Sequence, residues 1–160
     1  MDVLQVIKDD QQKVKDLFAS CATATVKTIQ ASLSGVERAL FQQLHVEQNY
    51  LYPELDGFLK RGDVHLDIWA ANHRSIERLW KKLTSDLKKN ELNEKDLADR
   101  WQSVSVAVES HFDSQNEVIL PAMRKCIPTS DREELAEVFT DAKEDMVSFK
   151  APAKGHAKRA

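Results

Sequence analysis

The chain has 160 residues, of which 42% are hydrophobic and 31% are charged, and its formal net charge is −3. This length predicts one domain with a sizeable core, and the charge excludes a basic protein that binds nucleic acid by general electrostatic attraction. Four glycines and four prolines leave few interruptions, which favours long helices over a multistranded sheet.

The two cysteines, Cys21 and Cys126, are far apart and form no Cys-x-x-Cys motif. Neither a disulfide framework nor a thiolate metal site is therefore indicated, and both residues are expected to lie in the core. The N-terminus has no basic segment followed by an apolar run, and no apolar stretch is long enough to cross a bilayer. We therefore expect a cytoplasmic protein without a membrane partner.

The first half of the chain carries two periodic segments. Apolar residues at spacings of three and four predict an amphipathic helix over about residues 3–32. Ser34 and Gly35 are expected to end this helix, and a second helix is predicted over residues 36–60.

The second half predicts two more long helices. The third is expected over residues 63–89, with Asp63 as a candidate N-cap and two lysines at its C-terminal end. The fourth is expected to begin after Asn93, a second candidate cap, and to stop near Pro128.

A shorter fifth helix is expected to follow, because Ser130-x-x-Glu133 has the form of a capping box. Residues 151–160 have no hydrophobic face and carry three positive charges, so we expect a disordered basic tail, in which His156 is no more than an adventitious ligand. The predicted domain therefore covers residues 1–150.

Two internal repeats connect these helices. A ligand-like pair followed by proline occurs twice, 68 positions apart, as Gln43-x-x-x-Glu47-x-x-x-x-x-Pro53 and His111-x-x-x-Gln115-x-x-x-x-x-Pro121. A second repeat, at an offset of 62, aligns the segment around Gln11 with the segment around His73. Two related helical hairpins predict an all-α, up-down-up-down four-helix bundle in which equivalent positions face one another.

Residues four apart on a helix share a face, so three pairs can each point two polar side chains into this core. The pairs are Gln43 with Glu47, His73 with Glu77, and His111 with Gln115. Imidazoles and carboxylates that converge inside a bundle are typical of iron and manganese sites. A hydrogen-bonded interior without metal is the alternative for the same residues.

The sequence resembles the hemerythrin-like (HHE cation-binding) family over its four long helices. The residues that carry the resemblance are Ile7-Lys8-Asp9-Asp10-Gln11, Leu51-Tyr52-Pro53 and Ile119-Leu120-Pro121. The resemblance implies a non-haem di-iron centre with one His from the first helix, His-x-x-x-Glu from the second, one or two ligands from the third, and a second His-x-x-x-Glu or Asp from the fourth.

Position by position, the resemblance implies a lopsided site. Gln11 and Gln43 stand where the family has the two histidines of one iron, and Gln115 replaces a bridging carboxylate. His73 and His111 match the histidines of the other iron, Glu47 matches a carboxylate that bridges both, and Glu77 falls where the family has a second His or a carboxylate. An amide oxygen is a poor iron ligand. His45 and His65 are expected to be surface or boundary residues.

Three functions follow as hypotheses. The first is a single metal, one iron per chain or else zinc or manganese, held by Glu47, His73, Glu77 and His111, which would bind or sense O2, NO or peroxide or would handle metal. The second is a haem bundle with His73 or His111 as axial ligand, supported by three tryptophans: Trp69, Trp80 and Trp101. The third is a metal-free interaction or regulatory module whose glutamines form a hydrogen-bonded core.

No nucleophile beside a base, phosphate-binding loop or dinucleotide fingerprint stands out in the sequence. A conventional enzyme is therefore not predicted, and the expected partner is a metal ion or a small ligand. Nothing in the sequence identifies a protein partner.

Overall fold

Helices are the only regular secondary structure in the parts of the chain that the computed structural model describes, residues 1–59 and 67–146. They are α1 (Val3–Cys21), α2 (Ile29–Val46), η1 (Glu47–Leu51), α3 (Tyr52–Leu59), α4 (Asp67–Lys88), α5 (Glu94–Ser114), η3 (Gln115–Ile119), α6 (Leu120–Cys126) and α7 (Thr129–Asp145). The two η elements are single turns of π-helix. The all-α prediction is confirmed.

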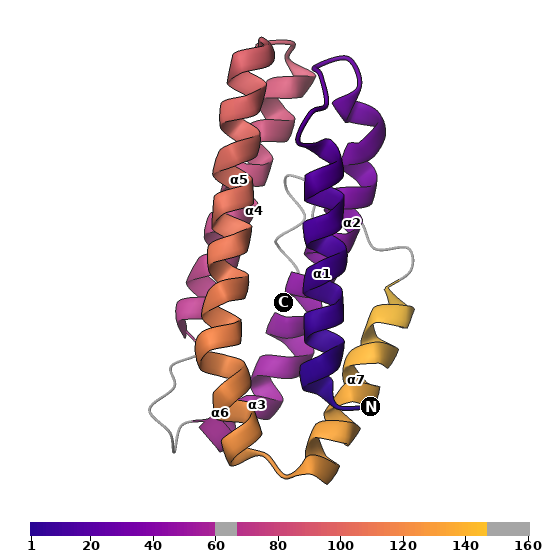
Figure 1. Ribbon diagram of the computed structural model, residues 1–160, viewed down its shortest axis with the longest axis vertical. Coiled ribbons are helices and arrows are strands. Elements are labelled where there is room, and N and C mark those ends of the chain that lie inside the picture. The colour runs from indigo at the N-terminus through magenta and orange to yellow at the C-terminus, as the bar shows by residue number, and fades with distance from the viewer. Residues whose placement is uncertain (60–66, 147–160) are drawn as a thin grey trace, which may run out of the picture.

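These elements form four rods and one accessory helix (Figure 1). The elements α2, η1 and α3 follow one another without a break, as do α5, η3 and α6, and α1 and α4 are the other two rods. The rod of α1 packs on α2, α4 packs on α5, and α7 lies against α1, α2 and η1. The predicted four-helix bundle with an additional C-terminal helix is therefore confirmed.

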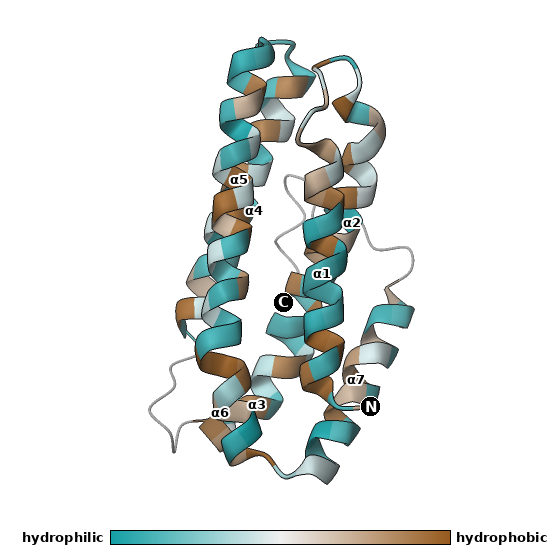
Figure 2. Ribbon diagram, in the orientation of Figure 1, coloured by the Kyte–Doolittle hydropathy of each residue, from teal (hydrophilic) through white to brown (hydrophobic). Residues whose placement is uncertain are grey.

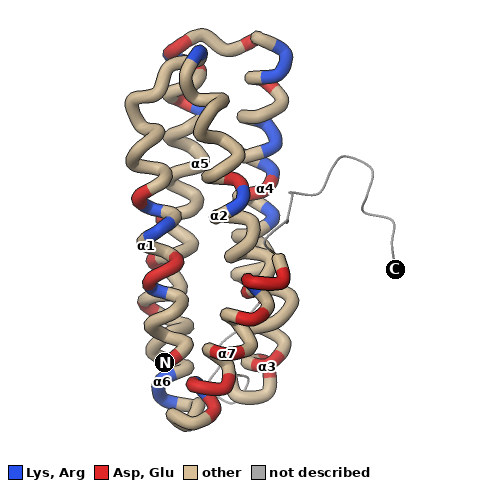
Figure 3. The backbone as a smooth tube through the Cα atoms, turned by 90° about the vertical axis from the view of Figure 1, so that its right-hand side faces the viewer, with Lys and Arg blue, Asp and Glu red and all other residues tan. Residues whose placement is uncertain are grey.

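Each rod is amphipathic, as the periodicity predicts. Figure 2 shows hydrophobic and hydrophilic residues alternating along the helices, and Figure 3 shows acidic and basic residues interspersed along α1 and α4. No helix in the described ranges is both long and apolar enough to span a membrane.

The first connection between helices lies earlier than predicted. The helix α1 already ends at Cys21, and α2 runs through Ser34 and Gly35 without a break. The break comes instead from Thr25 and Thr28, because each threonine hydroxyl accepts the other's backbone N–H, at 2.9 and 3.3 Å. Gly35 is exposed and needs no special conformation. The predicted end near residue 32 and break at Ser34-Gly35 were wrong.

The other predicted helix ends had mixed outcomes. Asn93 caps α5 as expected, since its Oδ1 accepts the Asp96 N–H at 2.8 Å. The capping box at Ser130 was wrong: α7 begins directly after Pro128, and the Ser130 hydroxyl donates to Asp131 instead. The predictions for Asp63, His65 and the basic tail lie outside the described residues.

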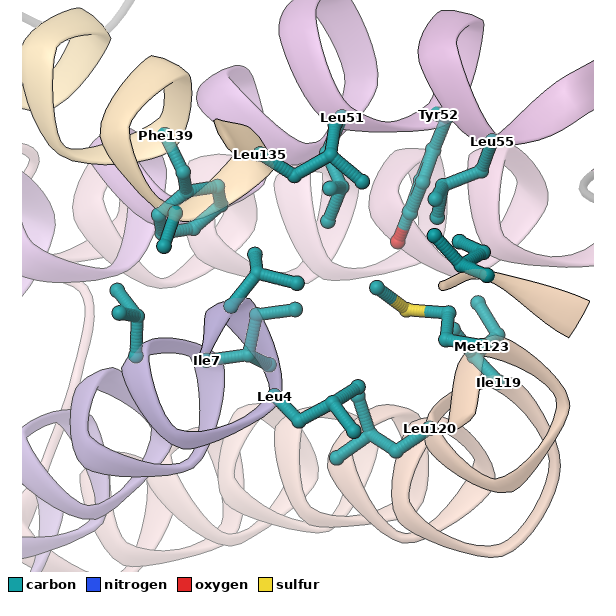
Figure 4. Packing of buried hydrophobic residues seen from close by; sticks show 14 of the residues in the cluster. Leu4, Ile7, Leu51, Tyr52, Leu55, Ile119, Leu120, Met123, Leu135 and Phe139 are labelled. Carbon is teal, nitrogen blue, oxygen red and sulfur yellow. The ribbon is translucent and has the colours of Figure 1, made fainter. Parts of the chain in front are cut away.

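The core consists of two apolar clusters. One contains residues from α1, the π turns, α3, α6 and α7, including Leu4, Ile7, Leu55, Met123 and Phe139 (Figure 4). The other fills the opposite end of the bundle and contains aromatic residues: Phe18, Phe41, Trp80, Trp101 and Phe112. Cys21 is a buried member of the second cluster, as predicted, whereas Cys126 is only half-buried.

Candidate metal centre

A layer of buried polar residues separates the two apolar clusters. Each rod contributes a member between a residue of one cluster and a residue of the other; His73, for example, lies between Trp69 and Ile76. The layer consists of Gln11, Gln43, Glu47, His73, His111 and Gln115, each at most 3% exposed. The two internal repeats therefore bring their equivalent positions together inside the bundle.

Three of these residues form a compact group of potential metal ligands. Glu47 Oε2 lies 3.2 Å from His73 Nε2 and 3.3 Å from His111 Nε2, and the two imidazole nitrogens are 3.2 Å apart. Ligand atoms around one tetrahedral ion with bonds of about 2.0 Å are themselves about 3.3 Å apart. The three atoms are therefore spaced as ligands of a single ion, and all three side chains are buried.

The group contains one firmly ionised carboxylate. Burial alone would raise the pKa of Glu47, but the hydrogen bonds and charge of His111 and His73 outweigh burial and hold this pKa far below its usual range. Glu47 Oε1 also accepts a hydrogen bond from Gln43 Nε2 at 3.0 Å. Glu47 is thus held in the charged form that a metal requires.

Gln48 fixes the position of one proton on His73. The Gln48 Oε1 atom lies 3.2 Å from His73 Nδ1 and can only accept, so Nδ1 carries a proton and Nε2 is the ring atom available to a metal. In the form that binds metal, the Nε2 lone pair faces Glu47 Oε2 and His111 Nε2, which are also potential acceptors. A proton or a metal cation must lie among the three atoms to offset their repulsion.

The other half of the polar layer is filled by amides and a phenol. Gln11 Nε2 donates to Gln115 Oε1 at 2.9 Å, Gln115 Nε2 donates to the Tyr52 hydroxyl at 3.1 Å, and this hydroxyl donates to Glu47 Oε2 at 3.1 Å. Burial and the Glu47 carboxylate raise the pKa of Tyr52 well above that of an ordinary phenol. The chain of hydrogen bonds ends at the same oxygen that faces both histidines.

The π turns are what bring Tyr52 into this layer. The Tyr52 N–H bonds to the Glu47 carbonyl five residues back, and the Leu120 N–H bonds to Gln115 in the same way in the second copy. The repeat in the sequence is thus a repeat in the backbone, with a π turn starting at Glu47 and at Gln115. The rods continue past Pro53 and Pro121, so the prolines mark these turns and do not end the helices.

The remaining predicted histidines and Glu77 lie elsewhere. Glu77 is half-buried and its carboxylate does not belong to the group formed by Glu47, His73 and His111. His45 is half-buried at the bundle boundary, as expected, and burial lowers its pKa. Sequence reasoning did not identify Tyr52 or Gln48 as members of the site.

The family assignment rests on the whole domain. A scan against protein-family models matches residues 2–149 to the hemerythrin HHE cation-binding domain. The chain belongs to the hemerythrin HHE cation-binding family. Searches of curated proteins and of solved structures found no match.

This hemerythrin HHE domain has few buried side chains that could serve as metal ligands. Among the described residues, the group that could hold a metal contains one carboxylate and two imidazoles. Three neutral glutamines, Gln11, Gln43 and Gln115, occupy the remaining inward positions. This hemerythrin-like domain therefore combines a buried candidate cation site with a neighbouring polar layer that carries no ligand-type side chain other than Tyr52.

Proposed function

We propose that this hemerythrin-like domain binds one divalent metal ion per chain, iron in the cell, through Glu47, His73 and His111. The observation that supports the proposal is the triangle of Glu47 Oε2 and the two Nε2 atoms, with edges of 3.2 to 3.3 Å, in a site that is almost fully buried. Two imidazoles and one carboxylate are the ligand set of mononuclear non-haem iron sites.

The ligand set also supports a role for the ion. Three protein ligands leave open positions, and an iron in such a site supplies a binding position for a small molecule such as O2, NO or peroxide. We therefore propose small-ligand binding or sensing, or handling of the metal itself, and no defined chemical reaction. We also propose that residues 1–150 form a single domain.

The haem alternative finds little support in the contacts. An axial histidine must present Nε2 to the face of a porphyrin, but Nε2 of His73 and of His111 each face the other ring and Glu47, all within 3.3 Å. The tryptophans belong to the apolar clusters, where Trp80 and Trp101 pack against each other. These aromatic residues need no cofactor to explain them.

The metal-free alternative has one observation in its favour, because Gln11, Gln115 and Tyr52 already form a continuous hydrogen-bonded chain. Two buried atoms of the polar layer, Gln43 Oε1 and His111 Nδ1, nevertheless have no hydrogen-bond partner among the described residues. A network kept only for structure is expected to satisfy its buried polar atoms.

The test is anaerobic loading with ferrous iron, removal of loose metal, and elemental analysis. We expect about one iron per wild-type chain, and loss of at least about 100-fold in affinity for His73→Ala or His111→Ala because each removes a direct ligand. The matched control is His45→Ala, a histidine outside the triad, which should bind like the wild type. Equal iron binding by all four proteins would refute the assignment.

A further inference from the structure

The Tyr52 oxygen is placed like a fourth ligand of the proposed metal. It lies 3.1 Å from Glu47 Oε2 and 3.3 Å from His73 Nε2, which are the same separations that the three proposed ligand atoms have from one another. The ring enters the bundle from the first turn of α3, and its hydroxyl points into the interior (Figure 4).

A hydrogen bond from Gln115 orients the Tyr52 oxygen. Gln115 Nε2 donates to the Tyr52 oxygen at 3.1 Å, and Gln11 Nε2 in turn donates to Gln115 Oε1 at 2.9 Å. This donated hydrogen bond orients the Tyr52 oxygen, while burial and the Glu47 carboxylate raise the pKa of the phenol. The two glutamines therefore act as positioning residues that aim the Tyr52 oxygen at the triangle of proposed ligand atoms.

The net charge of the proposed ligands also supports Tyr52 as a further ligand. Two neutral imidazoles and the Glu47 carboxylate supply a single negative charge, which leaves a divalent ion with one uncompensated positive charge in a fully buried site. Gln115, at the position equivalent to Glu47 in the other half, is neutral and cannot supply the second charge. The Tyr52 oxygen is adjacent to the same ligand atoms, so it is placed to share the charge of a bound ion.

We infer that Tyr52 is a ligand of the metal held by Glu47, His73 and His111. On coordination the Tyr52 O–H bond breaks, its electron pair forms the bond to the metal, and the proton is released to solvent. The inference rests on the proposed function. It adds a fourth ligand, an anionic oxygen, to the three ligands proposed there.

The experiment uses iron and a redox-inert probe in parallel. Ferric iron bound by a phenolate has an intense visible charge-transfer absorption with tyrosinate vibrations in its resonance Raman spectrum, and gallium(III) binding produces the ultraviolet difference spectrum of one tyrosinate. The chain has only two tyrosines, and Tyr50 is 43% exposed on the same turn, so Tyr50→Phe is the matched control. We expect wild type and Tyr50→Phe to give both signals and Tyr52→Phe to lose both while keeping one iron per chain.

The outcomes separate the inference from the proposed function. One iron per wild-type chain without the charge-transfer band, or a band that disappears in Tyr50→Phe, overturns Tyr52 ligation and leaves the three-residue site intact. No iron in the wild type overturns both. If Tyr52→Phe fails to fold, the gallium signal of Tyr50→Phe alone decides, since Tyr52 is then the only tyrosine that can produce it.

Discussion

At the scale of single residues, the candidate site depends on a hydrogen bond that lies outside the three proposed ligands. Gln48 accepts from His73 Nδ1 at 3.2 Å and so directs the lone pair of Nε2 toward Glu47 and His111. Partners of this kind orient a ligating imidazole and raise its basicity. The side chain of Gln48 reaches the site from an exposed position, so it can be replaced without disturbing the core.

We therefore predict that Gln48→Leu lowers metal affinity by about 10 to 100-fold without changing the number of metals bound. The measurement is a competitive titration against a chelator. The internal repeat offers a control in Asn116, the residue equivalent to Gln48, whose Oδ1 has no hydrogen-bond partner in the described part of the chain. Asn116→Leu should bind metal like the wild type, and an equal loss in both variants would contradict the role given to Gln48.

The sequence predicted all six members of the polar layer but not the residues beside them. Glu47, His73 and His111 follow from helical spacing and from the repeats. Tyr52 does not, because residues five apart on an α-helix point about 140° away from each other. Only the π turn, with its bond from Tyr52 to Glu47, brings both side chains to one face.

At the scale of helices, the π turns leave a trace in the sequence. Both long rods carry unbroken rows of buried residues at a constant spacing of four: 43, 47, 51, 55 and 59 in one, and 111, 115, 119, 123 and 127 in the other. On an ideal α-helix such a row drifts by about 40° at each step and would leave the core. A constant spacing of four is therefore the signal from which the turns could have been predicted.

The helix α7 is fixed to the bundle by a partly buried ion pair. Lys143 Nζ lies 2.5 Å from Asp10 Oδ2, and Asp10 is 6% exposed beside Gln11 of the polar layer. We predict that Lys143→Met destabilises the protein by about 1 to 3 kcal/mol in urea unfolding, because it leaves a buried carboxylate without its closest partner. The double variant Asp10→Asn with Lys143→Met should recover much of that loss. Additive losses would show that the pair does not stabilise the docking.

Asp2 connects the start of α1 to α7 and makes stability depend on pH. Its carboxylate accepts the Leu4 N–H at 2.9 Å and pairs with Arg132 at 2.8 Å. Burial opposes the effect, but the Leu4 hydrogen bond and Arg132 together lower the pKa of Asp2.

Because the folded pKa of Asp2 lies below the unfolded value, the stabilisation is complete above about pH 4 and is lost as pH falls through the lowered folded pKa. Asp2→Asn keeps the cap but not the charge. We predict a deficit of up to about 1 kcal/mol at neutral pH that shrinks as the pH falls through the lowered pKa of Asp2, measured by urea unfolding from neutral to acidic pH. A deficit that stays constant with pH would contradict the linkage.

At the scale of the whole molecule, the pattern of apolar residues in the sequence predicted the fold. It did not predict the connection between the first two helices. Apolar periodicity and the repeats predicted the four rods, and the match over residues 2–149 confirms the family. The break between α1 and α2 was misplaced because a Ser-Gly pair was weighed above Thr25 and Thr28, whose mutual hydrogen bonds end one helix and begin the next. Local side-chain bonds of this kind leave no periodic signal.

The polar layer of the bundle is lopsided. One half holds a carboxylate and two imidazoles, and the other half holds three amides, so the chain should bind one metal and not two. The two rods with a π turn each carry one proposed ligand and one amide, and the turn at Gln115 repeats the backbone of the turn at Glu47. Replacing the amides by ligand-type side chains, as Gln11→His, Gln43→His and Gln115→Glu together, should therefore restore a second site.

The most direct test is the number of metal ions bound per chain, measured by elemental analysis after anaerobic ferrous loading of the wild type and of this triple variant. We expect about one iron in the wild type and about two in a folded triple variant. Two irons in the wild type, or none, would contradict this expectation.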